Sequence, residues 1–355
     1  MAKAETTRGM LMEHYRAYPR LELRDVFKFI YQSSFGCEHS VSSLETVKAR
    51  IEEEYSSAFA GPDRKAEPLD GDYVRVPLSY MKQGISADTL SKLFFLSAKK
   101  EESGMASLLE KLDVVRNMIS NGELPFSKEA FEAALAEWRD KDFAAVRHSD
   151  SFREEYKPSY RVISKQFVPF LPLFAELDRR LAAGILRVAI EGGSASGKST
   201  LADIISKVYD CTIFHMDDFF LRPEQRTPER FAEIGGNVDR ERFLSEILLP
   251  MSRGEAVIYR KFDCSKMDLG DTMREEPKAL TVTEGAYSLH PDLACYYDFT
   301  VFLDVTEEAQ KARILKRNSP EMAKRFFSEW IPMEKRYFSE MHVPEKCDLV
   351  IKIEK

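Results

Sequence analysis

The chain has 355 residues, of which 44% are hydrophobic and 31% are charged, and its formal net charge is −7 at pH 7. This composition is typical of a globular protein rather than of a disordered or membrane one. The acidic balance and the lack of an apolar run of roughly 18 residues exclude the usual signatures of nucleic-acid-binding and membrane-spanning proteins, so we expect neither partner.

The first half of the chain has the apolar spacing of helices. Apolar residues recur at helical spacing within 23–31, 108–119 and 131–138, and Ser127 is placed to cap the last of these helices. A short strand is expected from Tyr73 to Val76. We therefore expect an α-rich domain over residues 1–182, whose role the sequence does not reveal.

The second half alternates short apolar runs with helical or loop segments. These runs cover 186–190, 211–214, 280–282, 299–303 and 349–351. Short buried strands that alternate with helices indicate a parallel sheet covered on both faces. We expect an α/β domain over residues 183–355, with five parallel strands flanked by helices.

A phosphate-binding loop follows the first of these strands. The motif G-x-x-x-x-G-K-[ST] lies between an apolar strand and a helix, which is the context that the motif requires. Backbone N–H groups and the helix N-terminus wrap a polyphosphate, Lys198 reaches the β- and γ-phosphates, and the Ser199 hydroxyl ligates Mg²⁺. The expected ATP-binding residues are Gly192, Gly193, Ser194, Ala195, Ser196, Gly197, Lys198, Ser199 and Thr200.

Carboxylates end two further strands. Asp217 and Asp218 follow the run 211–214, and Glu284 with Gly285 follows 280–282. Because ligands of open α/β sheets bind outside the carboxyl ends of strands, Asp217 is placed to accept a proton from an attacking hydroxyl. Glu284 is placed to hold Mg²⁺. The alternative for either aspartate is a helix N-cap.

These motifs resemble those of the uridine kinase and phosphoribulokinase family over residues 185–355. GGSASGKST is close to the loop of uridine kinases, and DDFF at 217–220 resembles their Asp-Ser-Phe-Tyr element. Asn237 to Asp239, Tyr259 to Asp263 and Glu284-Gly285 follow in the family's order. The resemblance implies a P-loop kinase that transfers phosphate from Mg-ATP to a hydroxyl of a small molecule.

The resemblance also implies roles for single residues. Asp217 would be the catalytic base and Lys198 the cation on the transferred phosphoryl group. Asp239 and Tyr259 would contact the acceptor, and Arg313 and Arg317 would bind phosphate from a lid. The chain departs from the family after Tyr259, where Arg260 and Lys261 stand in place of a base-reading His-Ser-Arg element. Arg260 suits an acidic or phosphorylated acceptor, and the nucleoside assignment weakens.

Two clusters in the first half invite a chemical interpretation. Cys37-Glu38-His39 lacks the further ligands that a metal site needs, so a loop at a helix end is the simpler interpretation. His148-Ser149-Asp150 has the composition of a nucleophilic triad, but consecutive residues seldom face one point. We expect neither to be catalytic.

The sequence also suggests an alternative function and a cellular location. The alternative is a nucleotide-dependent regulatory ATPase or switch with the helical domain as its effector. The five cysteines have no paired spacing and the N-terminus lacks a secretory signal, so we expect a cytoplasmic protein. The expected partner is a small-molecule hydroxyl substrate, and a homo-oligomer is compatible with the sequence.

Overall fold

The structure is a computed structural model that describes residues 2–36, 43–58, 65–98 and 104–354. The chain divides into two compact units, Met1–Asp178 and Arg179–Lys355. Within the described ranges, no helix combines the length and the apolar character needed to cross a membrane. The four cysteines of these ranges, Cys211, Cys264, Cys295 and Cys347, are free thiols.

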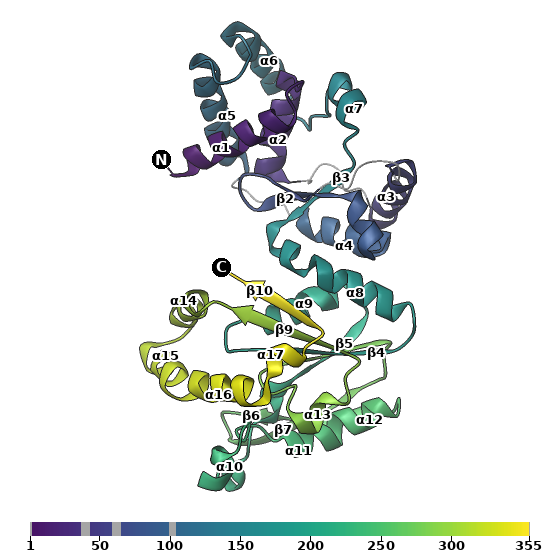
Figure 1. Ribbon diagram of the computed structural model, residues 1–355, viewed down its shortest axis with the longest axis vertical. Coiled ribbons are helices and arrows are strands. Elements are labelled where there is room, and N and C mark those ends of the chain that lie inside the picture. The colour runs from purple at the N-terminus through teal and green to yellow at the C-terminus, as the bar shows by residue number, and fades with distance from the viewer. Residues whose placement is uncertain (1, 37–42, 59–64, 99–103, 355) are drawn as a thin grey trace. The chain divides into compact units, whose positions relative to one another are not determined.

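The N-terminal unit is rich in helices and contains a small antiparallel sheet with strand order β1-β2-β3 (Figure 1). The strands are β1 (Glu67–Pro68), β2 (Tyr73–Pro77) and β3 (Tyr160–Ser164). The α-helices are α1 (Ala2–Ala17), α2 (Leu23–Phe35), α3 (Leu44–Ala58), α4 (Ala87–Ser97), α5 (Gly104–Ser120), α6 (Lys128–Asp140), α7 (Asp150–Tyr156) and α8 (Leu171–Leu181); the 3-10 segments are η2 (Leu78–Gln83) and η3 (Lys165–Phe170).

The helices of this unit follow the apolar spacing of the sequence. In α6, Phe131, Leu135 and Trp138 are buried, and the Ser127 hydroxyl accepts a hydrogen bond from the backbone N–H of Ala130. Such a cap satisfies one of the N–H groups that a helix start leaves unpaired. The expected helices and the strand at Tyr73 are therefore confirmed.

Seven polar residues from six separate segments form what we call the buried polar cluster. Its two branches meet at the Gln32 side-chain oxygen, which accepts a hydrogen bond from Arg75 Nε at 2.9 Å and lies 3.4 Å from the Tyr160 hydroxyl oxygen. In one branch Arg75 Nη1 lies 3.4 Å from Glu67, whose Oε1 lies 2.6 Å from His14 Nδ1. In the other, His148 joins the Tyr160 hydroxyl (2.7 Å) to Asp25 (2.8 Å). The members are His14, Asp25, Gln32, Glu67, Arg75, His148 and Tyr160.

The cluster shifts the pKa values of its members. Burial raises the pKa of Asp25, but hydrogen bonds from His148 and Ser149 hold it at about 2. Arg75 and His14 hold the pKa of Glu67 at about 2 against the same effect of burial. Burial lowers the pKa of His148 to about 4, although Asp25 opposes this change. Both carboxylates are therefore ionised and His148 is neutral at pH 7.

We expect the N-terminal unit to lose stability in two stages on acidification. His148 binds protons more readily in the unfolded chain, so stability falls as the pH drops from about 6.5 to 4. Asp25 and Glu67 have lowered folded-state pKa values, so their contribution is lost between about pH 4.5 and 2. Urea unfolding of a Trp330→Phe variant, followed by the fluorescence of Trp138, measures this unit alone, because the chain has two tryptophans. A midpoint that is constant from pH 7 to 4 would contradict the expectation.

The C-terminal unit is built on a five-stranded parallel sheet with strand order β10-β9-β4-β8-β5. Helix α9 covers one face, and α11 to α13 and α16 lie on the other (Figure 1). The expected α/β fold is thus confirmed, with every expected strand present. The strands are β4 (Leu186–Gly192), β5 (Cys211–His215), β8 (Leu280–Glu284), β9 (Phe299–Val305) and β10 (Leu349–Ile353).

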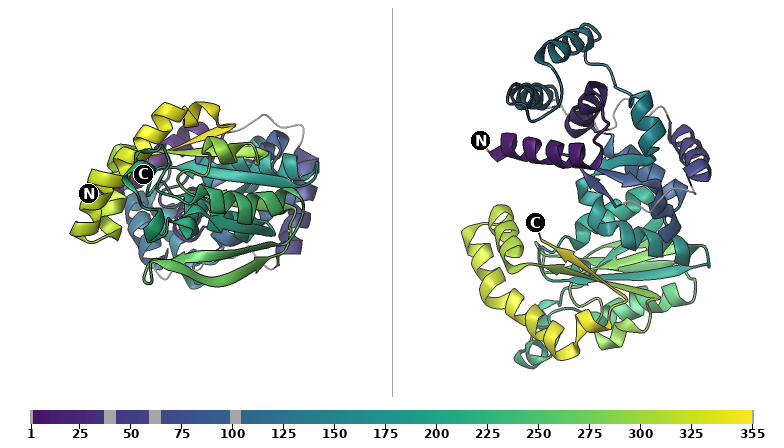
Figure 2. Two further views of the ribbon diagram at one scale, coloured as in Figure 1. Left: turned by 90° about the horizontal axis from the view of Figure 1, so that it is seen from below. Right: turned by 45° about the horizontal axis from the view of Figure 1, so that its top comes forward.

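The connections hold the helices and a separate hairpin. The hairpin pairs β6 (Val257–Asp263) with β7 (Asp268–Glu275) and appears as a long green ribbon beside the sheet in Figure 2. Its pairing was not predicted from the sequence, because β7 is mostly exposed and charged and lacks an apolar run. The α-helices are α9 (Lys198–Val208), α10 (Pro228–Ala232), α11 (Arg240–Phe243), α12 (Leu249–Ser252), α13 (Pro291–Ala294), α14 (Glu307–Arg317), α15 (Pro320–Arg325), α16 (Ile331–Met341) and α17 (Val343–Lys346). The 3-10 segments are η4 (Met216–Phe219) and η5 (Pro223–Gln225), and the π-helical segments are η6 (Leu244–Leu248) and η7 (Phe326–Trp330).

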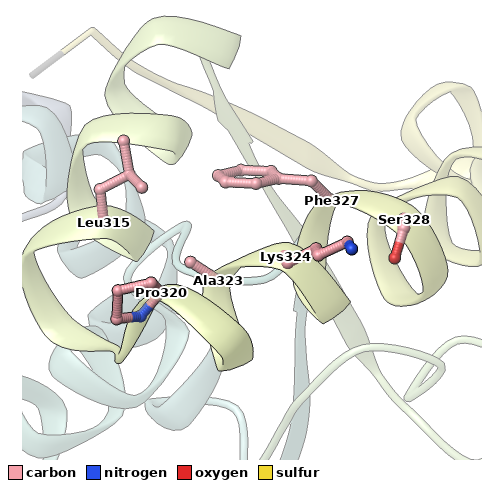
Figure 3. A pocket seen from close by; sticks show the side chains of 6 residues that line it. All are labelled: Leu315, Pro320, Ala323, Lys324, Phe327 and Ser328. Atoms are coloured by element: carbon pink, nitrogen blue, oxygen red, sulfur yellow. The ribbon is translucent and has the colours of Figure 1, made fainter.

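The helical segment from α14 to η7 has an open apolar hollow of about 420 Å³ on its surface. Figure 3 shows the Phe327 ring pointing toward Leu315 across this hollow. The hollow is lined by Leu315, Pro320, Ala323, Lys324, Phe327 and Ser328. It contains no carboxylate and none of the residues expected to bind phosphate.

Candidate active site

The phosphate loop connects β4 to α9 and needs glycine at its first position. Gly192 has φ 150°, and a Cβ there would lie 2.8 Å from the Leu303 carbonyl oxygen and 2.9 Å from Ser196 Oγ. Every other residue would therefore force the loop away from the neighbouring strand β9. At the other end, Gly197 precedes the first turn of α9, whose unpaired N–H groups face the loop.

The side chains of the loop leave polar groups available to a phosphate. Lys198 Nζ donates to the carbonyl oxygens of Gly192 and Gly193 at 2.8 and 2.9 Å, so its ammonium lies over the loop. Ser196 Oγ is buried and has no hydrogen-bond partner in the part of the chain that the structure describes. Ser199 and Thr200 are exposed at the start of α9. This arrangement fits a bound polyphosphate.

Strand register brings the two expected carboxylates to the same edge of the sheet. Glu284 pairs with Ile190 of β4 and with His215 of β5, so the carboxyl ends of all three strands lie together. Gly285 allows η4 to approach, since a Cβ there would lie 2.5 Å from the Met216 Cβ. Asp217 follows Met216 directly. The expected convergence of the phosphate loop, Asp217 and Glu284 at one edge is what the structure contains.

Charges at this edge act on Asp217. Partial burial raises its pKa; Lys198 and His215 lower it, while Glu284 and Asp218 raise it. Glu284 is 5% exposed, and its Oε1 lies 2.6 Å from His215 Nδ1, which raises the pKa of His215. The Asp217 side chain keeps an exposed surface, so an acceptor can reach it.

The edge offers oxygen ligands that Mg²⁺ accepts. They are the Glu284 carboxylate and the Ser199 hydroxyl, and Mg²⁺ typically takes one or two carboxylates, with phosphate oxygens and waters as its other ligands. Among the described residues there is no group of three or more His, Cys, Asp or Glu that could hold a metal ion by itself. A cation at this edge would thus depend on the phosphates for part of its coordination.

Three residues that we expected to bind the acceptor already have partners. Asp239 is 3% exposed, caps α11 through the N–H of Arg242 and accepts a hydrogen bond from Gln225. Tyr259 is buried in the core and stacks on Phe219. Arg260 donates to two backbone carbonyl groups of β7 and ties the hairpin together. Their substrate-binding roles stay predictions.

The two expected lid arginines differ in position. Arg313 Nη1 donates to the Ala195 and Ser196 carbonyl oxygens at 2.9 and 3.1 Å, so its guanidinium braces the phosphate loop from α14. Arg317 is exposed in the last turn of the same helix.

Asp218 forms an ion pair with Lys261 of β6 at 3.0 Å, which sets it apart from its neighbour Asp217.

Two carboxylates that contact the loop were not predicted from the sequence. Glu334 of α16 is 5% exposed and accepts hydrogen bonds from the backbone N–H (2.9 Å) and hydroxyl (2.6 Å) of Ser194. Glu191 is fully buried, and burial raises its pKa to about 7 although Gly192 N–H and Tyr337 donate to it. An acidic residue at the end of a buried strand was a signal for Glu191. Glu334 had no local signal.

The two clusters noted in the first half have different outcomes. Cys37-Glu38-His39 lies outside the described residues. His148, Ser149 and Asp150 do not form a triad, because Asp150 is exposed and paired with Arg153, while Ser149 caps α7. His148 instead contacts Asp25, which is 123 positions away.

Comparisons with known proteins give the following neighbours. No family model and no curated protein matches the sequence. The chain is similar to a solved structure described as a possible uridine kinase from Bacillus stearothermophilus (19% identity, 50% of this chain and 99% of the other, TM-score 0.38). It is also similar to chains described as a fructose transport system kinase from Silicibacter sp. TM1040 (24%, 47% and 89%, 0.39) and shikimate kinase from Aquifex aeolicus (16%, 47% and 85%, 0.25). The N-terminal half has no counterpart in these matches. At these identities the likeness concerns the fold alone.

Proposed function

We propose that the C-terminal unit is an ATP-dependent phosphotransferase that acts on a hydroxyl of a small molecule, of the nucleoside or sugar type. The observation that carries the proposal is the meeting of the phosphate loop, Asp217 and Glu284 at the carboxyl ends of three adjacent strands. A kinase needs a phosphate cradle, a cation site and a base within one site. The resemblance of the sequence motifs in residues 185–355 to those of uridine kinases supports the same reaction.

The roles of the residues follow from their positions. Mg-ATP, when bound, would supply the phosphoryl group and the cation that offsets the negative charge of the phosphate oxygens. Asp217 accepts the proton of the acceptor hydroxyl as that oxygen forms its bond to the γ-phosphorus and the bond to the β,γ-bridging oxygen breaks, so that ADP leaves. Lys198 stabilises the charge on the transferred group, and Ser199 and Glu284 would hold the cation.

A screen of acceptors tests this proposal. Full-length protein with Mg-ATP is incubated with nucleosides, sugars, phosphorylated sugars or small acids, and ADP release is followed by a coupled assay. We expect slow release without an acceptor and a strong increase with one class. Slow hydrolysis that no acceptor accelerates would favour the regulatory ATPase instead.

The contact of Glu334 with the phosphate loop leads to a further prediction. Its carboxylate accepts a backbone N–H of the loop that would bind phosphate, so it places negative charge beside the polyphosphate. Glu334→Gln keeps a hydrogen-bond acceptor and removes the charge. We expect about tenfold tighter binding of a non-hydrolysable ATP analogue, measured by calorimetry.

A matched control lies on the same helix. Glu340 is paired with Arg336 and exposed, so Glu340→Gln should leave the affinity unchanged. Equal or weaker binding by Glu334→Gln would show that this carboxylate supports the loop in its nucleotide-bound form.

A further inference from the structure

The buried polar cluster of the N-terminal unit lies outside the proposed kinase site. None of its seven residues belongs to the phosphate loop, to the carboxylates near it or to the C-terminal unit. The cluster joins α1, α2, β1, β2, β3 and the residue His148 before α7. A function for it would therefore be a second function of the chain.

The protonation states of the cluster follow from its hydrogen bonds. Because Asp25 is ionised, His148 Nδ1 carries a proton and donates it to Asp25. His148 is neutral, so its Nε2 accepts the hydrogen of the Tyr160 hydroxyl. Asp25, His148 and Tyr160 thus form a chain along which a proton can move. The Tyr160 oxygen keeps lone pairs for a further donor.

Two polar atoms of the other branch lack partners. Arg75 is 1% exposed and His14 is 3% exposed, yet Arg75 Nη2 and His14 Nε2 have no hydrogen-bond partner among the residues that the structure describes. The two groups lie close together, since Arg75 Nη1 and His14 Nδ1 both contact Glu67 Oε1, at 3.4 and 2.6 Å. Arg75 Nη2 is a donor that needs an acceptor. His14 donates from Nδ1 to the ionised Glu67, and its lowered pKa leaves Nε2 as an acceptor that needs a donor.

Stability alone does not account for such a cluster. Buried ion pairs lose much of their attraction to desolvation, and apolar residues of similar volume often give an equally stable core. Native proteins also leave few buried polar atoms unpaired. Buried titratable groups with shifted pKa values and unpaired atoms are typical of functional sites.

We propose that the buried polar cluster is a second binding site, which takes a small oxyanion that also carries a hydroxyl group. The oxyanion accepts a hydrogen bond from Arg75 Nη2, for which a charge-assisted pair is the strongest partner. The hydroxyl donates to His14 Nε2. Hydrogen phosphate and its monoesters, and hydroxycarboxylates, share this chemistry.

Access to the site leads past Tyr160. The Arg75 guanidinium lies 4.9 Å from the centre of the Tyr160 ring and 5.6 Å from that of Phe29, so it contacts two aromatic side chains. Tyr160 is partly exposed and lies on the edge strand β3. A ligand that reaches Arg75 from this side displaces the Tyr160 ring.

NMR signals of the histidine side chains show where a ligand binds. The full-length protein, labelled with ¹⁵N-histidine, is titrated with inorganic phosphate, glycolate or acetate, and the signals are assigned with His→Gln variants. We expect phosphate and glycolate to shift His14 and His148, and acetate, which lacks the hydroxyl, to bind at least about tenfold more weakly. The probe that binds more tightly, phosphate or glycolate, assigns the ligand as a phosphate or as a carboxylate.

Two variants separate this site from the phosphate loop. Arg75→Lys keeps the charge but loses the planar fork, and we expect at least about tenfold weaker binding at His14 and His148. Lys198→Ala should leave these shifts unchanged, whereas binding at the loop would shift His215. Shifts at His215 alone, no shift with any probe, or shifts that Arg75→Lys does not weaken would each overturn the proposal. The wild-type signals decide the location even where Arg75→Lys does not fold.

Discussion

Asp217→Asn is expected to lower the rate of phosphoryl transfer by about 10³-fold, because a positioned general base contributes about 10²- to 10⁴-fold. Asn has the shape of Asp but cannot accept the proton of the acceptor. The charges around Asp217 already compete over its pKa, which Lys198 lowers and Glu284 raises. The affinity for Mg-ATP should change by no more than about threefold, since the base acts on the acceptor.

The neighbouring aspartate provides the control. Asp218 is paired with Lys261, so Asp218→Asn should reduce the rate by less than about tenfold. The comparison uses single-turnover transfer with saturating Mg-ATP and the acceptor found in the screen. A wild-type rate in Asp217→Asn, or a larger loss in Asp218→Asn, would assign the base to another residue.

Arg75→Met is expected to destabilise the N-terminal unit by about 3–5 kcal/mol, the usual cost of breaking a buried ion pair on one side. Arg75 is 1% exposed, and its removal leaves Glu67 next to His14 without its cation. The free energy of unfolding is measured in urea through Trp138, in the Trp330→Phe background. A loss below about 1 kcal/mol would mean that Glu67 finds another partner or takes up a proton at little cost.

Two further variants test whether the loss of stability in Arg75→Met comes from leaving a buried charge without its partner. Arg20 forms an exposed pair with Glu155, so Arg20→Ala should cost about 1 kcal/mol or less. The double variant Arg75→Met with Glu67→Met removes both charges and should recover part of the stability that Arg75→Met loses. A double variant at least as stable as the wild type would mean that the charges are kept for a reason other than stability, whereas partial recovery would mean that the pair itself stabilises the unit.

The sequence predicted those features of the kinase unit that depend on local patterns. The phosphate loop needs glycine, lysine and serine at fixed spacing, and the runs before Asp217 and Glu284 are short buried strands. Because parallel strands end at the same edge, these residues could be placed together without a structure. The same logic gave the five-stranded sheet.

Contacts between distant segments could not be predicted in this way. Glu334 reaches Ser194 across 140 positions, and Asp25 reaches His148 across 123. Neither pair has a spacing that a helix or strand would impose. The resemblance implied contact with the acceptor for Asp239 and Tyr259, and the charge of Arg260 suited an acidic acceptor. The fold also gives each of them a partner, in a cap, the core or a hairpin, which the sequence did not indicate.

The fate of the γ-phosphate tests the central claim most directly. Full-length protein is incubated with γ-³²P-labelled ATP, Mg²⁺ and the acceptor that stimulates ADP release, and the labelled products are separated beside an Asp217→Asn reaction. We predict that the label passes to the acceptor with wild-type protein and that almost none passes with the variant. Label recovered only as inorganic phosphate, at equal rates with and without the acceptor, would contradict the assignment of this unit as a small-molecule kinase.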